Sequence, residues 1–195
     1  MSERPRVRVG VVGAGFVARI HAEAYRHVRG VDVELRWVTA RRPERARAFA
    51  EEFGVGGTAD DVRRIFDDPE VDLVDLCVPN AVHASLGLAA ARAGKHVIVE
   101  KPLTGFFGDP STPRAEMLRA ALGSADELIG ACRAAGVRLC YAETWVYAPP
   151  IQKARRLLRA AGGPILRLVG EESHSGTHAP ANKRWATAGG GSLLG

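Results

Sequence analysis

The segment VRVGVVGAGFVARIHAEAY, residues 7–25, constrains the fold more than any other part of the chain. An apolar run ends in the pattern G-x-G-x-x-A, formed by Gly13, Gly15 and Ala18, and a helix-like sequence follows at once. In a strand–turn–helix unit of this kind, the first glycine permits a tight turn and the second lets a pyrophosphate approach the backbone. The small third residue allows close packing of helix and strand. The segment therefore predicts the first βα unit of a dinucleotide-binding sheet.

The start of the helix would supply the phosphate contacts. Amides at Phe16, Val17 and Ala18 precede any intrahelical hydrogen bond, and they lie at the positive end of the helix dipole. The alternative is a tight turn that binds no ligand. A strand before the turn, a helix after it and a second strand about twenty residues on are the context that favours the dinucleotide.

The end of the second expected strand bears on which dinucleotide binds. A strict NAD site carries an acid there for the ribose hydroxyl, whereas this chain has Ala40, Arg41 and Arg42. Either arginine suits the 2′-phosphate of NADP, because a guanidinium donates charge-assisted hydrogen bonds to phosphate. We expect NADP or NAD with a preference for NADP; the alternative is that both arginines are simply solvated.

Strand-like and helix-like segments alternate through the first three quarters of the chain. This alternation, with nearly unbroken apolar strands, predicts an α/β fold with a doubly wound parallel sheet of the Rossmann type. Further strands are expected at 33–40, 71–78, 96–100 and 137–143, and helices at 43–53, 81–93 and 124–136, with a shorter one in DDVRRIF. Ser124 and Glu127 form a capping-box pattern, so Ser124 is the expected start of the last of these helices.

The pattern changes at Pro149 and Pro150. We expect a dinucleotide-binding domain at 1–148 and the incomplete beginning of an α+β domain for substrate or oligomer contacts at 149–195. The second unit would open with a helix, IQKARRLLRAAGG, and continue as a strand, PILRLVGEESHSG.

Composition excludes several other classes of protein. The net charge is +5, but the arginines are dispersed among glutamates, so we expect no nucleic-acid partner. No apolar run approaches the length that crosses a bilayer, and arginines interrupt the N-terminal apolar stretch, so we expect a cytoplasmic location and no membrane partner. The three cysteines form no disulfide or zinc pattern, and no metal is expected.

A second candidate site lies where the apolar strand in GKHVIVEKPLTG stops on an acid, a base and a proline. Doubly wound sheets bind their ligands beyond the carboxyl ends of the strands, and the strand in VDLCVPNAVH should end beside this one. The expected site residues at these two ends are Pro79, Asn80, His83, Glu100, Lys101 and Pro102. The alternative is that strands end in polar loops for no functional reason.

Three stretches together resemble the Gfo/Idh/MocA family, the glucose–fructose oxidoreductase and inositol dehydrogenase group. They are GVVGAGFVARIHAEAY, VDLVDLCVPNAVHASLGLAAARAGKHVIVEKPL and VRLCYAETWVYAP, in the order of the family, and they cover most of residues 5–150. GKHVIVEKP is the most diagnostic of the motifs. The loop TGFFGDPSTPRAEM, longer than in many members, and Glu143–Thr144 depart from the pattern and leave the substrate open.

The resemblance implies an NAD(P)-dependent oxidoreductase that acts on a sugar, cyclitol or related small molecule. It implies that Lys101 lies beside the nicotinamide and the reacting hydroxyl as the catalytic residue, with Glu100 touching the cofactor side or holding Lys101. In the family the Lys101–Pro102 bond is often cis. The rival function is a non-catalytic dinucleotide-binding module.

Several other residues are weaker candidates. One group has the residue types that bind metals: Glu171, Glu172, His174 and His178. Their spacing on a strand does not bring them together. His21 is placed near the cofactor or in packing. For Trp145 and Tyr147, core or interface packing is favoured over the substrate wall.

The final residues, ATAGGGSLLG, resemble the family sequence that precedes a motif carrying a catalytic histidine. From this we expect a fragment that folds its Rossmann half, binds cofactor and catalyses little alone. Residues after about Pro164 would be poorly ordered or paired with another chain, because an apolar strand edge without neighbours tends to associate. A homo-oligomer is left open.

Overall fold

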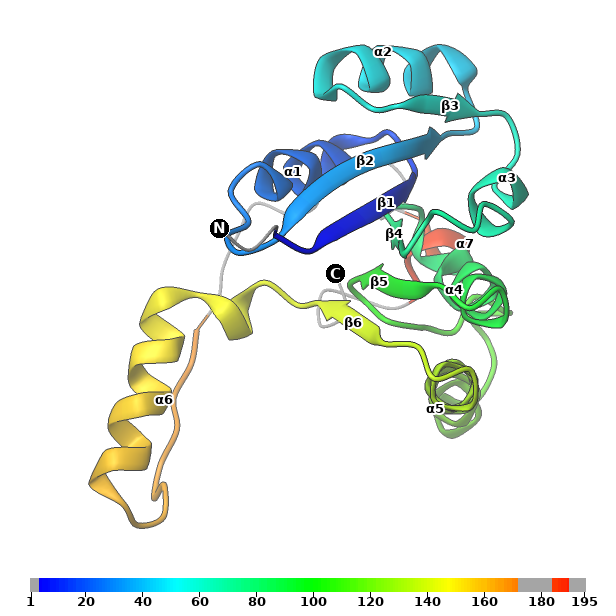
Figure 1. Cartoon of the computed structure of the whole chain (residues 1–195). Helices are drawn as coiled ribbons and strands as arrows, with labels where there is room; N and C mark the ends of the chain where they lie inside the picture. The colour runs from blue at the N-terminus through cyan, green and yellow to red at the C-terminus, as the bar shows by residue number, and fades with distance from the viewer. Residues whose placement is uncertain (1–3, 172–183, 190–195) are drawn as a thin grey trace.

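A six-stranded parallel sheet forms the centre of the computed structural model, which describes residues 4–171 and 184–189 (Figure 1). The strand order is β3-β2-β1-β4-β5-β6. The order in which strands are added changes side between β1 and β4, as in a doubly wound Rossmann sheet. The α/β prediction is therefore confirmed. The strands are β1 (Arg6–Val12), β2 (Asp32–Thr39), β3 (Gly57–Ala59), β4 (Leu73–Leu76), β5 (His96–Glu100) and β6 (Leu139–Ala142).

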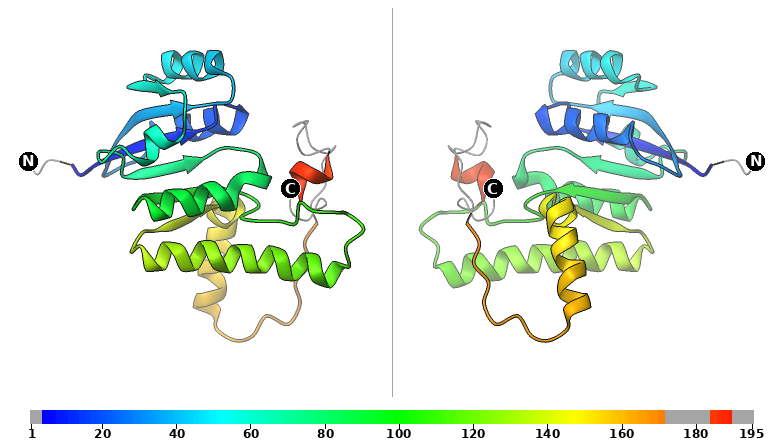
Figure 2. Two further views of the ribbon diagram at one scale, coloured as in Figure 1. Left: turned by 90° about the vertical axis from the view of Figure 1, so that its right-hand side faces the viewer. Right: turned by 90° about the vertical axis from the view of Figure 1, so that its left-hand side faces the viewer.

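Helices cover both faces of this sheet. Figure 2 shows α4 and α5 on one face and α1 on the other. None of the helices in the described ranges combines the length and the apolar character that a bilayer span needs. The helices are α1 (Phe16–Tyr25), α2 (Pro43–Phe53), α3 (Arg63–Phe66), α4 (His83–Arg92), α5 (Arg114–Ala134), α6 (Pro149–Ala161) and α7 (Trp185–Ala188), with 3-10 turns η1 (Asn80–Val82) and η2 (Trp145–Tyr147).

Each face of the sheet has its own apolar core. Side chains of β1 such as Val9 and Val11 pack against Ala18 and Ala22 of α1 and Phe49 of α2. On the other face, β4 and β5 pack their side chains against α4 and α5, in a cluster made largely of Val74, Leu76, Val97, Val99, Ala90, Ala91 and Leu128. Successive residues of a strand point to opposite faces. Asp75, next to Val74, and Glu100, next to Val99, therefore face α1.

The helix expected at 124–136 is longer than the sequence indicated. α5 begins at Arg114, so the prediction that Ser124 caps it is wrong and Ser124 lies within the helix. The carbonyl oxygen of Pro113 accepts the amides of Glu116 and Met117 and starts the helix there. The intervening residues are mostly good helix formers, which outweighs the local capping-box pattern.

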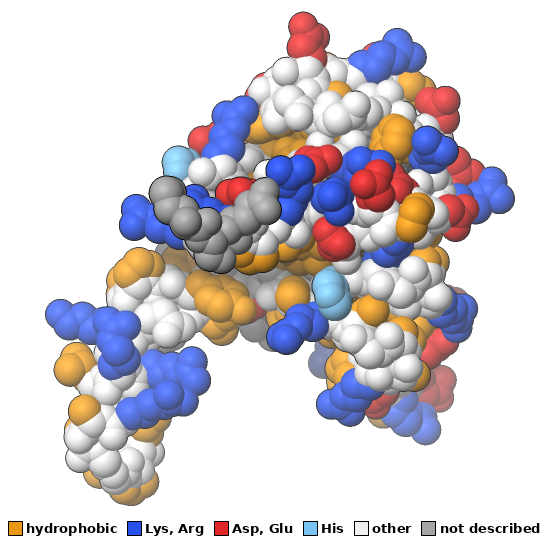
Figure 3. All heavy atoms as spheres, in the orientation of Figure 1, with side chains coloured by type: hydrophobic (Ala, Val, Ile, Leu, Met, Phe, Trp, Pro, Cys, Tyr) orange, Lys and Arg blue, Asp and Glu red, His pale blue; other side chains and the backbone are white. Residues whose placement is uncertain are grey.

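The stretch after α6 also differs from expectation. Residues 164–171 form no strand, because no neighbour in the described part of the chain pairs with their backbone. α6 contacts η2, none of its side chains is buried, and it stands away from the sheet with arginine and lysine side chains on its surface (Figure 3). The short β3 and α7 had no clear sequence signal, and 172–183 lie outside the described residues.

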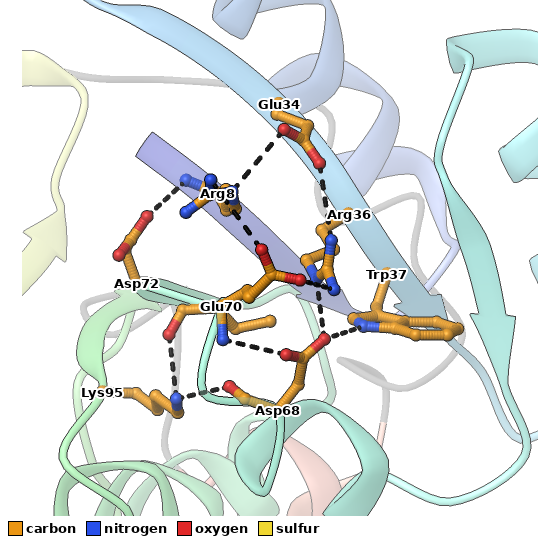
Figure 4. A network of polar contacts seen from close by, with 9 residues as sticks. Arg8, Glu34, Arg36, Trp37, Asp68, Glu70, Asp72 and Lys95 are labelled. Carbon is orange, nitrogen blue, oxygen red and sulfur yellow. Dashed lines mark hydrogen bonds and ion pairs between the residues drawn. The ribbon is translucent and has the colours of Figure 1, made fainter. Parts of the chain in front are cut away.

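A polar network closes the amino-terminal edge of the sheet (Figure 4). The Asp68 carboxylate accepts hydrogen bonds from Arg36 Nε at 2.7 Å, Trp37 Nε1 at 2.6 Å and the Glu70 amide at 2.9 Å. Lys95 is buried, and its ammonium donates to two main-chain carbonyl oxygens of the same loop, at 2.6 and 2.9 Å. Partial burial works to raise the pKa of Asp68, but the bonds from Trp37 and Arg36 outweigh it and lower the pKa to about 2.

We predict that Asp68→Asn lowers the free energy of unfolding by roughly 1–3 kcal/mol near neutral pH, since hydrogen bonds to a charged group are weakened. Because folding lowers this pKa, the stabilisation is present above the unfolded value of about 4 and is lost as pH falls toward 2. Urea unfolding of both proteins across this pH range measures the difference. Asp60→Asn, at an exposed position, is the control and should have little effect; a difference that does not shrink in acid would contradict the assignment.

Candidate functional site

The glycine turn after β1 lies directly against the end of β4. Gly13 has φ +109° and donates its amide to the carbonyl oxygen of Thr39 at 2.8 Å. A Cβ at this position would lie 2.1 Å from the carbonyl oxygen of Cys77. Both the dihedral and the close approach therefore require glycine, and the turn brings the start of α1 to the carboxyl edge of the sheet.

Gly15 leaves open space in front of the helix. An added Cβ would meet no atom within 4 Å, and φ is −93°, so neither packing nor backbone geometry requires glycine here. The first intrahelical bond runs from the Arg19 amide to the Gly15 carbonyl oxygen at 3.3 Å, which leaves the amides of residues 16–18 outside the helical ladder. Phe16 is exposed, Val17 is half-buried and Ala18 is buried. Open space beside amides that make no intrahelical hydrogen bond fits a pyrophosphate.

Ala40, Arg41 and Arg42 follow β2 at the same edge of the sheet. Thr39 is buried and Ala40 half-buried, whereas both arginines are exposed at the start of α2. Arg42 takes the extended backbone of the helix N-cap. The two arginines thus follow directly after the strand that neighbours β1 and its glycine turn.

The loops after β4 and β5 are joined by a buried histidine. His83 is fully buried, with Nδ1 2.8 Å from the carbonyl oxygen of Pro102 and Nε2 3.0 Å from that of Val78. These contacts occupy both ring nitrogens, so His83 links the loop after β4 to the loop after β5. Asn80 donates its side-chain amide to the carbonyl oxygen of Ala188 at 3.2 Å, which ties α7 to the same edge, and Pro79 is exposed.

Glu100 and Lys101 stand at the end of β5. Lys101 is exposed, and its peptide bond to Pro102 is cis, as the family resemblance implied. Glu100 is largely buried: its Oε2 accepts the Lys101 amide at 3.0 Å, and its Oε1 lies 3.0 Å from His21 Nε2. The acid therefore fixes the main chain of the lysine, whose side chain is exposed.

The sequence analysis missed the groups that surround His21. Asp75 is fully buried; its Oδ2 lies 2.9 Å from His21 Nδ1 and accepts the Tyr25 hydroxyl at 2.8 Å. Cys77 Sγ lies 3.5 Å from both His21 Nδ1 and Asp75 Oδ1. An acid in the middle of the apolar run VDLVDLCV was the available signal, because a buried carboxylate requires partners.

Burial and charge shift the ionisation of this cluster in different directions. Burial disfavours a charged imidazole, but hydrogen bonds to Asp75, Cys77 and Glu100 outweigh it and raise the pKa of His21 well above its ordinary value. Burial, together with the Asp75 charge, raises the pKa of the Tyr25 hydroxyl and raises that of the Cys77 thiol to about 12. These shifts favour a positive charge on the ring and a protonated thiol.

Metal-binding residue types also come together here. One ligand atom each of His21, Asp75 and Cys77 lies within 4.8 Å of the others. A thiol with a raised pKa is a poor ligand, because metals bind the thiolate. Of the expected weak candidates, Glu172, His174 and His178 lie outside the described residues, while Trp145 and Tyr147 are exposed in η2.

Comparison with known proteins agrees with this geometry. Residues 7–141 match the model of an oxidoreductase family with an NAD-binding Rossmann fold, GFO_IDH_MocA. The chain belongs to the Gfo/Idh/MocA oxidoreductase family. The glycine turn, the carboxyl ends of β4 and β5 and the Glu100–Lys101 pair all lie within the matched residues.

Two curated relatives of this Gfo/Idh/MocA chain illustrate the match. It is 40% identical over 103 residues to levoglucosan dehydrogenase of Pseudarthrobacter phenanthrenivorans, covering 50% of this chain and 26% of that protein. It is 34% identical over 182 residues to 1,5-anhydro-D-fructose reductase of Ensifer adhaerens, covering 83% of this chain and 53% of that protein. The alignments thus span from about a quarter to about half of these relatives.

A solved structure of the family is similar as well. Levoglucosan dehydrogenase in complex with NADH and levoglucosan superposes with a TM-score of 0.69 and 26% sequence identity. The superposition covers 80% of this chain and 40% of that one.

We predict that substitution of Gly13 mainly affects stability, whereas substitution of Gly15 mainly affects dinucleotide binding. Gly13→Ala should lower the free energy of unfolding by at least about 2 kcal/mol, because its Cβ meets a backbone carbonyl at an unfavourable φ. Gly15→Ala should change stability by no more than about 0.5 kcal/mol, yet weaken dinucleotide binding at least about tenfold by filling the open space. Thermal unfolding and NAD(P)H fluorescence titration measure the two effects. Unchanged dinucleotide affinity in the Gly15 variant would contradict the proposed phosphate site.

Proposed function

We propose that this chain is the cofactor-binding part of an NAD(P)-dependent oxidoreductase that acts on a hydroxyl of a sugar, cyclitol or related small molecule. The observation that carries the proposal is the exposed Lys101 at the end of β5, at the same edge of the sheet as the glycine turn of β1 and fixed through its amide by Glu100. The curated relatives support the substrate class, since they are named for levoglucosan and for 1,5-anhydro-D-fructose.

The chain's own residues divide the work as follows. The amides of residues 16–18 bind the pyrophosphate beside Gly15, and Arg41 and Arg42 bind the adenosine ribose or its 2′-phosphate. The nicotinamide, when bound, supplies the carbon that accepts or donates the hydride. Lys101 orients the substrate hydroxyl; as the neutral amine it takes the hydroxyl proton when the substrate is oxidised, and as the ammonium it returns that proton in the reverse direction. His83 and Asn80 hold the loops around that position.

We further propose that residues 149–195 begin the unit that completes the substrate site. Supporting this, α6 stands off the sheet with Ile151, Leu157 and Leu158 exposed. A homo-oligomer and a cytoplasmic location stay predictions from the sequence.

The cofactor preference can be tested on the two arginines after β2. We expect NADP to bind at least as tightly as NAD, and Arg41→Ala with Arg42→Ala to weaken NADP at least about tenfold while changing NAD less than about threefold, because each lost charge-assisted bond is worth roughly 1.5–3 kcal/mol. Calorimetric titration with both dinucleotides measures this. Arg45→Ala, exposed in the first turn of α2, is the control. A clear NAD preference that survives the double substitution would reject the NADP assignment.

The reaction is tested at Lys101. Lys101→Ala should lower turnover by at least about a hundredfold, the usual loss for a missing acid–base group, and leave dinucleotide affinity within a few-fold. The assay follows NAD(P)H absorbance with a panel of sugars and cyclitols, for this chain and for a version extended with a second domain of the family type. Lys153→Ala, exposed on α6, is the control. If both this chain and the extended version bind the dinucleotide without turnover, the protein is the non-catalytic module instead.

A further inference from the structure

His21 lies between two carboxylates that come from neighbouring strands. Its Nδ1 is 2.9 Å from Asp75 Oδ2, and its Nε2 is 3.0 Å from Glu100 Oε1. A neutral imidazole has one N–H and one lone pair, whereas an ionised carboxylate only accepts hydrogen bonds. Two such contacts therefore need a proton on each ring nitrogen or on one carboxyl group. The imidazole is the stronger base, so the proton belongs on the ring.

Every group that faces the ring is consistent with this charge. Asp75 comes from β4 and Glu100 from β5, and both are anionic acceptors. Tyr25 of α1 donates its hydroxyl to Asp75 at 2.8 Å, which keeps that carboxylate an acceptor. The Cys77 thiol, next to the end of β4, is the fourth neighbour at 3.5 Å. Desolvation opposes a charged ring, and the two acids compensate for it.

Glu100 carries the effect of this charge to Lys101. One carboxylate oxygen of Glu100 is held by His21 and the other accepts the Lys101 amide at 3.0 Å. The side chain is thus fixed at both oxygens. Without the imidazolium, the carboxylate would keep only the main-chain contact and would be free to rotate away from it.

We propose that His21 is a positioning residue: its imidazolium holds the Glu100 carboxylate and, through it, the main chain that presents the Lys101 ammonium to the substrate hydroxyl. This inference rests on the proposed function for its catalytic consequence, but not for its structural one. It also links the cofactor-binding helix α1 to the catalytic strand end through one charged ring.

The charge on the ring is measured directly by nitrogen-15 NMR of the histidine side chains in the whole chain. We expect both His21 nitrogens to be protonated through about pH 9, more than two units above the ordinary histidine value. His27, exposed just beyond α1, serves as the internal reference. A His21 ring that carries a single proton at neutral pH would overturn the proposal. So would stoichiometric Zn²⁺ binding that removes the Nδ1 proton, because the cluster would then be a metal site.

The positioning role is measured on Lys101. In His21→Gln, hydrogen exchange of the Lys101 amide should rise at least tenfold, and turnover of an active form should fall at least tenfold with KM and dinucleotide affinity changed less than threefold. His27→Gln should change none of these. His21→Arg, which restores charge and two donors, should recover part of the amide protection. Unchanged Lys101 exchange in a folded His21→Gln variant would overturn the proposal.

A second variant covers the case in which His21→Gln does not fold. Glu100→Gln leaves the ring one anionic neighbour instead of two, so the His21 pKa should fall and Lys101 amide exchange should rise; no change in either would again overturn the inference. If the wild-type chain and its extended form turn over no substrate, the proposed function fails, while the ring protonation and amide exchange still decide the role of His21.

Discussion

Parallel pairing of β1 with β4, and of β4 with β5, is the constraint on which the rest of the structure depends. It brings three carboxyl strand ends to one edge of the sheet, close enough that Gly13 lies against the carbonyl of Cys77. The same pairing fixes which side chains face α1. Because β-strand side chains alternate, Asp75 and Glu100 emerge on the face of the sheet where His21 lies.

The predictable part of the fold was carried by long, regular patterns. The strands β1, β2, β4, β5 and β6 and the helix α2 follow from apolar runs and turn residues, and the strand order agrees with the doubly wound prediction. Local signals were less reliable. The capping box at Ser124 was overridden by helix formers on its N-terminal side, and the apolar stretch 164–171 forms no strand because an extended segment needs a neighbour to pair with.

The candidate site divides in the same way. Residues of the glycine turn and the Glu100–Lys101 pair carry local signatures, and the structure places them at a common edge of the sheet. The sequence did not reveal the partners of His21. Asp75 and Cys77 are distant from it in sequence, and only the packing of α1 on the sheet joins them to His21 and Tyr25. His83 shows a different limit, since its position was visible in the sequence but its two carbonyl partners were not.

Lys95 gives the chain a contrast of chemical reactivity between its two sheet edges. Lysine is rare in this arginine-rich sequence, and two of its lysines sit at opposite ends of the same strand-forming segment. The amine of Lys95 is sealed against carbonyl oxygens beneath β5, whereas that of Lys101 is open to solvent beyond it. An amine-directed reagent therefore reads local unfolding at the first position and solvent accessibility of the carboxyl end of β5 at the second, so one labelling experiment separates the integrity of the fold from the state of the site.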